Sequence, residues 1–83
     1  MSAAKTKRAA AEAAYRAARK AHKVALAEHA DAYVRQAQTP CDRPEFVDAY
    51  TRWSLACLRV QSAAEEVRKA GARVLGFVAR GAK

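Results

Sequence analysis

Both prolines of this chain lie in one short segment, QTPCDRPE, at positions 40 and 44. Proline interrupts a helix, because it has no amide hydrogen to donate and its ring clashes with the preceding turn. On either side of this segment the sequence is rich in helix-forming residues, and β-branched residues are scattered. The chain therefore predicts two long helices, one over about 3–38 and one over about 43–79, with a turn at 39–42.

The start of the second helix carries its own signal. Asp42 and Glu45, three positions apart, fit a capping box, and Pro44 lies in the first helical turn, where its missing amide hydrogen costs nothing. The second helix should therefore begin near Arg43. Because so short a connection forces consecutive helices to lie antiparallel, residues 1–83 are expected to form a single all-α domain, a two-helix hairpin.

Apolar residues recur along the second predicted helix in alternating steps of four and three, which is the spacing of a coiled-coil seam. The line comprises Phe46, Tyr50, Trp53, Cys57, Val60, Ala64, Val67, Gly71, Val74 and Val78. A second line runs beside it and widens the apolar face, with Ala49, Ala56, Ala63, Ala70 and Phe77. Since the spacing continues beyond Gly71, we expect the helix to run through this glycine; the alternative is that Gly71 ends it as a C-terminal cap.

Alanine recurs every seven residues in the first predicted helix, at Ala4, Ala11, Ala18, Ala25 and Ala32. A line of larger residues lies beside these alanines, at Tyr15, His22 and His29, and Leu26, Tyr33 and Val34 add apolar bulk toward the turn. Alanine at one position of the seven-residue repeat lets two helices approach closely. We therefore expect a coiled-coil-like, alanine-rich seam between the two helices.

Two helices alone enclose no core, and a chain of 83 residues buries little surface unless it associates. We therefore expect two hairpins to pair as a homodimer, which would complete a four-helix bundle. The residues predicted to form protein interfaces are Tyr15, His22, His29, Phe46, Tyr50, Trp53, Leu55, Leu58, Val60 and Val67.

Positive charge is concentrated near both ends of the chain, which carries a formal net charge of +8. Residues 1–23 contain seven Lys and Arg and one acid, residues 64–83 contain five and two, and residues 24–63 contain four and five. An antiparallel hairpin brings the two basic ends together, which favours contact with the phosphates of DNA or structured RNA. The predicted phosphate contacts are Lys5, Lys7, Arg8, Arg16, Arg19, Lys20, Lys23, Arg68, Lys69 and Arg73.

No pattern in the sequence indicates catalysis. There is no glycine-rich phosphate loop and no Ser/His/Asp set, and a two-helix chain offers little concavity for a small-molecule substrate. His22 and His29 are seven residues apart, about 10 Å along a helix, which is too far to share a metal ion. We expect no enzyme activity, no metal and no cofactor.

The sequence also bears on where the protein acts. No stretch approaches the ~18 apolar residues of a membrane span, and Cys41 and Cys57 follow no disulfide or zinc-ligand pattern. We therefore expect a soluble cytoplasmic protein without a membrane partner.

Leu55 and Leu58 point away from the predicted seam, with Arg52 and Arg59 beside them. If exposed, such a pair suits the docking of another protein. The first hypothesis is thus a small regulator that binds nucleic acid through its basic end. The second is a protein-binding inhibitor, adaptor or accessory structural protein, such as phages and other mobile elements encode, whose basic surface meets an acidic protein. The plainest interpretation is that the charge only keeps an alanine-rich helix soluble.

Overall fold

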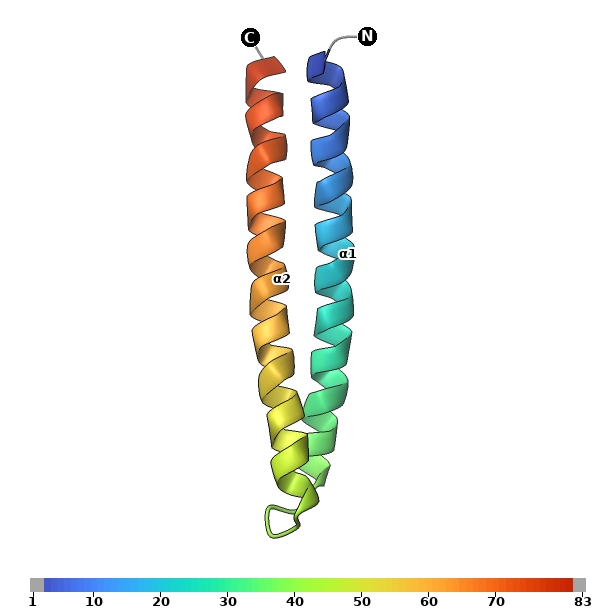
Figure 1. Cartoon of the computed structure of the whole chain (residues 1–83), viewed down its shortest axis with the longest axis vertical. Coiled ribbons are helices and arrows are strands. Elements are labelled where there is room, and N and C mark those ends of the chain that lie inside the picture. Colours follow the sequence, from blue (N-terminus) through green and yellow to red (C-terminus); the bar gives the residue numbers. More distant parts are fainter. Residues whose placement is uncertain (1–2, 82–83) are drawn as a thin grey trace.

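The structure is a computed structural model that describes residues 3–81. It contains two helices, α1 (Ala3–Gln38) and α2 (Glu45–Gly81), and no strand in these residues. The helices lie side by side and antiparallel, so the start of α1 and the end of α2 meet at the end of the rod opposite the turn (Figure 1). The predicted all-α hairpin is confirmed.

Thr39 and Pro40 end the first helix. The Thr39 amide donates to the Arg35 carbonyl at 3.1 Å, and the Thr39 hydroxyl donates to the same oxygen at 2.6 Å. Pro40 has no amide hydrogen and cannot extend this ladder. The last turn of α1 is therefore closed by a side chain as well as by the backbone.

The second helix begins at Glu45, two residues later than the sequence predicts. Two successive turns precede it, because the Arg43 amide donates to the Pro40 carbonyl and the Phe46 amide to the Arg43 carbonyl, each at 3.1 Å. A residue before proline avoids the helical conformation, so Pro44 keeps Arg43 out of the helix. Within residues 3–81 the Asp42 side chain makes no hydrogen bond to the helix start, so the expected capping box does not form.

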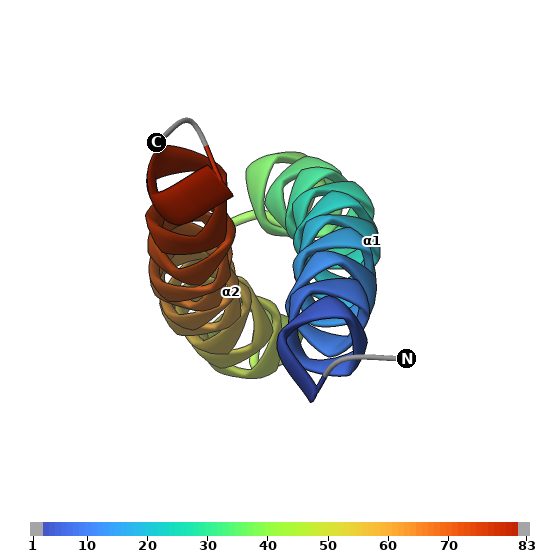
Figure 2. The same ribbon diagram turned by 90° about the horizontal axis from the view of Figure 1, so that it is seen from above.

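Most of the buried and half-buried side chains form one seam between the helices. In α1 they are Ala11, Tyr15, Ala18, His22, Ala25, His29, Ala32 and Gln36. In α2 they are Phe46, Ala49, Trp53, Ala56, Val60, Ala63, Val67, Ala70, Val74 and Phe77. Both lines alternate steps of three and four, and the helices shift sideways along the rod, as in a coiled coil (Figure 2). The alanine seam of α1 is the predicted one, although the side chain of Ala4 lies outside the described part.

The seam of α2 differs from the predicted one. The alanine line that the sequence places beside the seam lies inside it, whereas Tyr50, Ala64 and Val78 are exposed. Leu26 and Tyr33, predicted to add bulk to the seam near the turn, are about half exposed too, as is Val34. Alanines from both helices let the backbones come close, and the larger side chains then fit only at the sides.

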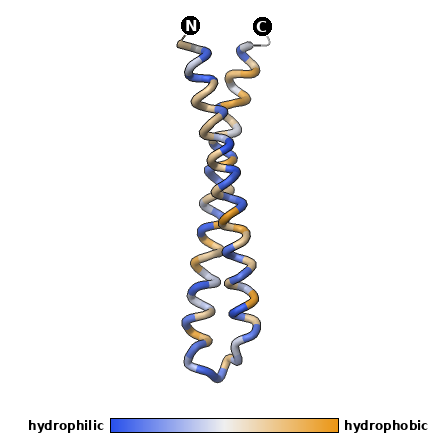
Figure 3. Tube along the Cα trace, turned by 90° about the vertical axis from the view of Figure 1, so that its right-hand side faces the viewer, coloured by the Kyte–Doolittle hydropathy of each residue, from blue (hydrophilic) through white to orange (hydrophobic). Residues whose placement is uncertain are grey.

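The hairpin has almost no interior of its own. Its buried apolar side chains are Ala25, Ala56 and Ala70, and hydrophobic and hydrophilic segments alternate along both helices (Figure 3). The radius of gyration is 18.6 Å, against about 12 Å for a compact domain of this length. The accessible surface is 6526 Å², about 1,700 Å² more than a folded monomer of this mass exposes by the usual scaling.

Aromatic side chains cluster near the turn, some in the seam and some beside it. The Trp53 ring lies 5.6 Å from the Tyr50 ring and 6.4 Å from the rings of His29 and Tyr33, measured between centroids. Phe46 continues the cluster at 5.9 Å from Tyr50. The indole nitrogen of Trp53 is buried and has no hydrogen-bond acceptor. Packing alone therefore holds this tryptophan.

Gly71 lies inside α2, so the expectation that the helix continues through it is confirmed. A Cβ atom at this position would lie 3.4 Å from Cε1 of Tyr15, an ordinary contact distance. Gly71→Ala should therefore raise the stability by about 0.5–1 kcal/mol, because alanine loses less backbone entropy in a helix. Thermal unfolding followed by circular dichroism measures this. Gly76→Ala is the control, because its Cβ would meet nothing closer than Arg80 at 3.9 Å; a gain there with a loss at Gly71 would contradict the prediction.

Candidate nucleic-acid interface

The seam has two flanks, and they differ in composition. Along α2, the residues that follow the seam alanines and Phe77 are Tyr50, Cys57, Ala64, Gly71 and Val78. The residues that precede the larger seam residues are Glu45, Arg52, Arg59, Glu66 and Arg73, and Arg80 continues this line. On α1, the residues that follow the seam alanines lie on the same flank as Tyr50, and they are Arg19, Leu26 and Tyr33. The residues that precede the larger seam residues of α1 lie on the other flank, and they are Ala21, Glu28 and Arg35. We call the flank with Tyr50 the tyrosine flank and the flank with Arg52 the arginine flank.

Contacts between the helices support this division. On the arginine flank, Arg59 reaches Glu28 across the seam, with Nη1 and Oε2 3.7 Å apart. On the tyrosine flank, the rings of Tyr33 and Tyr50 both lie against Trp53. Polar pairing thus closes one flank, while aromatic packing occupies the other.

A basic groove lies on the tyrosine flank, near the middle of the rod. It is open and shallow, with a volume of about 540 Å³. Its lining consists of Arg16, Arg19, Lys20, His22, Lys23, Leu26 and Val67. All but Val67 come from α1, where Arg16, Arg19, Lys23 and Leu26 recur once per helical turn. The groove therefore combines a row of cations with a small apolar surface formed by Leu26 and Val67.

The cations of the groove are not paired with acidic side chains in residues 3–81. Within residues 3–81, Arg16, Lys20 and Lys23 form no ion pair with a carboxylate. The Arg19 guanidinium lies over the Tyr15 ring, 5.8 Å from its centroid, so this arginine is oriented without being neutralised. Their charges are thus available to an anionic ligand.

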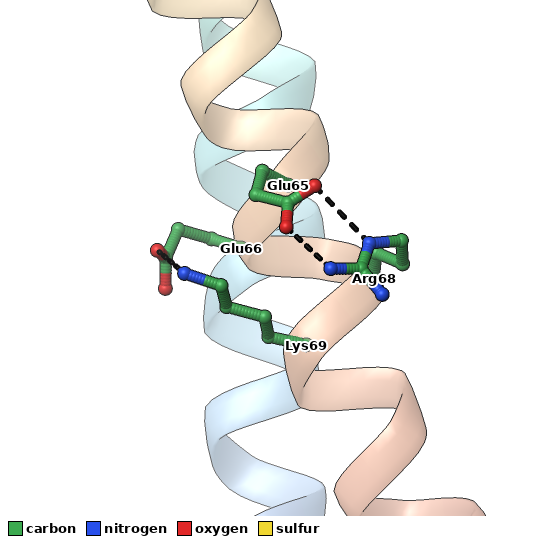
Figure 4. Close-up of polar contacts among 4 residues, drawn as sticks. All are labelled: Glu65, Glu66, Arg68 and Lys69. Carbon is green, nitrogen blue, oxygen red and sulfur yellow. Dashed lines mark hydrogen bonds and ion pairs between the residues drawn. The ribbon is translucent and has the colours of Figure 1, made fainter.

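Three of the other predicted phosphate contacts are paired with acids on their own helix. Arg8 Nε lies 3.1 Å from Glu12 Oε1, and Lys69 Nζ lies 3.9 Å from Glu66 Oε1. Arg68 bonds both carboxylate oxygens of Glu65, with Nε 3.1 Å from Oε2 (Figure 4).

These pairs also bear on ionisation. The hydrogen bonds that Arg68 donates lower the pKa of the Glu65 carboxyl and raise the pKa of the guanidinium. Glu65 therefore stays charged next to Arg68. Arg68 is a weaker candidate for phosphate contact than the cations of the groove.

The remaining predicted contacts do not share one face. The seven-residue repeat places Lys5 on the tyrosine flank with Arg19, but Lys7 and Arg73 on the arginine flank. The basic end of the rod therefore has cations on both flanks. Of the predicted phosphate contacts, Arg16, Arg19, Lys20 and Lys23 line one groove.

The predicted protein-interface residues fall into two sets. The first set lies in the seam within the hairpin, at Tyr15, His22, His29, Phe46, Trp53, Val60 and Val67. Tyr50, Leu55 and Leu58 are about half exposed or more. Leu55 lines a groove of about 220 Å³ on the arginine flank, together with Arg52 and Arg59, whereas Leu58 lies outside it. The arginines that the sequence places beside this leucine pair thus do adjoin Leu55.

Searches for other kinds of site give little. In the described residues no three His, Cys, Asp or Glu side chains gather as a metal site. Neither α1 nor α2, within residues 3–81, is long and apolar enough to cross a membrane. Comparison with protein families, with curated proteins and with solved structures finds no significant match.

Proposed function

We propose that this protein is a small, non-enzymatic regulator that binds nucleic acid through the basic groove. The observation that carries the proposal is the row Arg16, Arg19, Lys20 and Lys23, which lines one groove without paired acids. Cations that repeat once per turn are about 5 Å apart along the helix axis, which suits successive contacts with a phosphate backbone. Binding of this kind is independent of base sequence and sensitive to salt.

We further propose that the binding form is a homodimer of hairpins arranged as a four-helix bundle. The support is the excess of accessible surface and the lack of an interior in one hairpin. A second hairpin would cover the half-exposed apolar side chains and supply the missing core. The two cysteines are free, which suits the reducing cytoplasm, where nucleic acid is at hand.

The first test is fluorescence anisotropy of labelled duplex DNA and structured RNA, titrated with the protein at 50 and 200 mM salt, concentrations at which about six phosphate contacts change affinity on the order of 1,000-fold. We expect binding that weakens steeply at the higher salt concentration. The ratio of the RNA and DNA affinities identifies the preferred polymer. Absence of binding at the lower salt concentration would overturn the proposal.

A second candidate function rests on the groove that contains Leu55. Here Arg52 and Arg59 stand beside an exposed leucine, a composition that suits an acidic protein partner. The protein would then act as an inhibitor, adaptor or accessory structural protein. Arg59 and Arg52 are already paired with Glu28 and Asp48, at 3.7 and 3.6 Å, and so offer less free charge than the basic groove. This is why we place nucleic acid first.

A further inference from the structure

The tyrosine flank changes character at Leu26, which lines the basic groove and also begins the uncharged half toward the turn. Toward the turn, the flank and the helix positions beside it, on the side away from the seam, carry no charged residue. The residues there are Leu26, Ala30, Tyr33 and Ala37 on α1, and Val47, Tyr50, Ser54, Cys57 and Gln61 on α2. Four of these side chains are large, apolar and exposed, at 45% for Leu26, 53% for Tyr33, 48% for Tyr50 and 69% for Val47.

We propose that a second copy of this chain packs against this uncharged half, with the two turns side by side, and that the two basic grooves then face each other. The contact would be isologous, since each copy offers the same patch to the other. This contact specifies the interface of the homodimer proposed above. The role of the facing grooves rests on the proposed binding of nucleic acid.

The size of the exposed surface argues for a second copy as the occupant. One hairpin exposes about 1,700 Å² more than a monomer of its mass is expected to expose. A standard protein interface covers about 800 Å² on each partner. The excess is therefore large enough for a stable interface on each hairpin. A second hairpin has a patch of the same length and composition, so it can cover the whole patch with side chains of the same kind.

Composition decides which flank the second copy covers. The arginine flank of α2 carries a charge at every repeat, from Glu45 to Arg80, whereas the tyrosine flank of α2 carries none from Tyr50 to Val78. Burying the arginine flank would remove water from Arg59 and Glu28, whose attraction does not fully offset that loss. The tyrosine flank has no such cost in its turn half.

The charge pattern also decides the orientation of the two copies. With the turns at opposite ends, Leu26 of one copy would lie over Arg16 of the other, and the uncharged half would face the basic end. Buried cations without partners are strongly disfavoured. With the turns side by side, apolar side chains meet apolar side chains, and the cations of both grooves remain in water.

This orientation couples dimerisation to the ligand. The facing grooves repel each other, so their halves of the rods separate slightly, and a chain of phosphates between them would remove the repulsion. Nucleic acid should therefore tighten the dimer, and the dimer should tighten nucleic-acid binding by the same factor. Without nucleic acid, added salt should tighten the dimer, because it screens the repulsion.

Sedimentation of two matched variants without nucleic acid tests the contact. Leu26 and Leu55 are half exposed to nearly the same degree, 45% and 49%, but lie on opposite flanks. Leu26→Glu should weaken the dimer on the order of 100-fold, because each interface then buries two carboxylates. Leu55→Glu should sediment as the unchanged dimer. A monomeric unmodified chain, or a dimer that survives Leu26→Glu, would overturn the proposal.

The orientation has a test that keeps the four large apolar side chains of the contact. Cys41, in the turn, is exposed, so spin labels can be attached there in a Cys57→Ala background. Pulsed electron paramagnetic resonance should give a distance between the two spin labels well below half of the 62 Å length of the rod. A distance near the full length would show turns at opposite ends and overturn the proposed orientation. This measurement does not depend on whether the Leu26→Glu variant folds.

The two proposals fail in different ways. A dimer with the expected variant pattern that binds neither DNA nor RNA contradicts the proposed function while supporting the contact. A monomer that binds nucleic acid contradicts the contact while supporting the function. Salt titration of the unmodified dimer adds a third readout, since a dimer that weakens with added salt contradicts the side-by-side turns.

Discussion

Replacing Trp53 with alanine should destabilise the protein by about 3 kcal/mol or more, the usual cost of removing a large aromatic side chain from a packed site. Three aromatic rings, of Tyr50, His29 and Tyr33, lie within 6.4 Å of the indole. The buried apolar residues elsewhere in the described seam are alanines, which cannot compensate for the cavity. Urea denaturation followed by circular dichroism measures the loss, and the midpoint should fall with it.

Two further variants isolate the cause. Trp53→Phe keeps an aromatic ring and removes the indole N–H that has no acceptor, so it should cost less than about 1.5 kcal/mol. Val47→Ala changes a side chain that is exposed and should shift stability by no more than about 0.5 kcal/mol at a protein concentration too low for dimers. Equal losses for Trp53→Ala and Val47→Ala would show that the aromatic cluster does not anchor the hairpin.

The helices and their orientation follow from the sequence because the signals are local. Two prolines in one segment separate long helix-forming stretches, and a short turn leaves only the antiparallel arrangement. The start of α2 depends on more than one local signal. The capping pattern predicts that Pro44 lies in the first helical turn, but the structure closes two turns around Arg43 before the helix begins.

The register of α2 depends on the partner helix, and this limits a prediction from its own sequence. Three neighbouring lines of α2 are uncharged, and any two adjacent lines form a seam of period seven. The alanines of α1 decide the choice, because Ala18, Ala25 and Ala32 leave room for a close approach. Tyr15 then packs over Gly71, and Tyr50 moves to the flank.

The site was predictable in part. The concentration of cations at both chain ends shows in the sequence, and so do the acids three or four residues from Arg8, Arg68 and Lys69 that pair with them. The groove itself could not be predicted from the sequence, because it exists only where α2 leaves one side of α1 open. Once the seam is known, the seven-residue repeat assigns Arg16, Arg19 and Lys23 to one side.

Reversing the charge of the groove should have the largest effect on binding. The triple variant Arg16→Glu, Arg19→Glu, Lys23→Glu should lower nucleic-acid affinity on the order of 1,000-fold for each groove that contacts the phosphates, because each charge-assisted contact contributes about 1.5 kcal/mol. The slope of log affinity against log salt should also decrease by about 3 for each such groove, since each lost phosphate contact changes it by about 0.9. Anisotropy titrations at several salt concentrations measure both quantities.

A matched control separates the groove from the net charge of the rod. Reversing Lys7, Lys69 and Arg73 to glutamate changes the net charge by the same amount, but on or beside the arginine flank. If the groove binds the phosphates, this control should lose affinity only through the weaker long-range field, on the order of 10-fold at low salt and less at high salt. Equal losses in the two variants would mean that the whole basic end attracts nucleic acid and that the groove has no special role. Leu55→Asp with Leu58→Asp should leave the affinity unchanged, because neither leucine lines the groove.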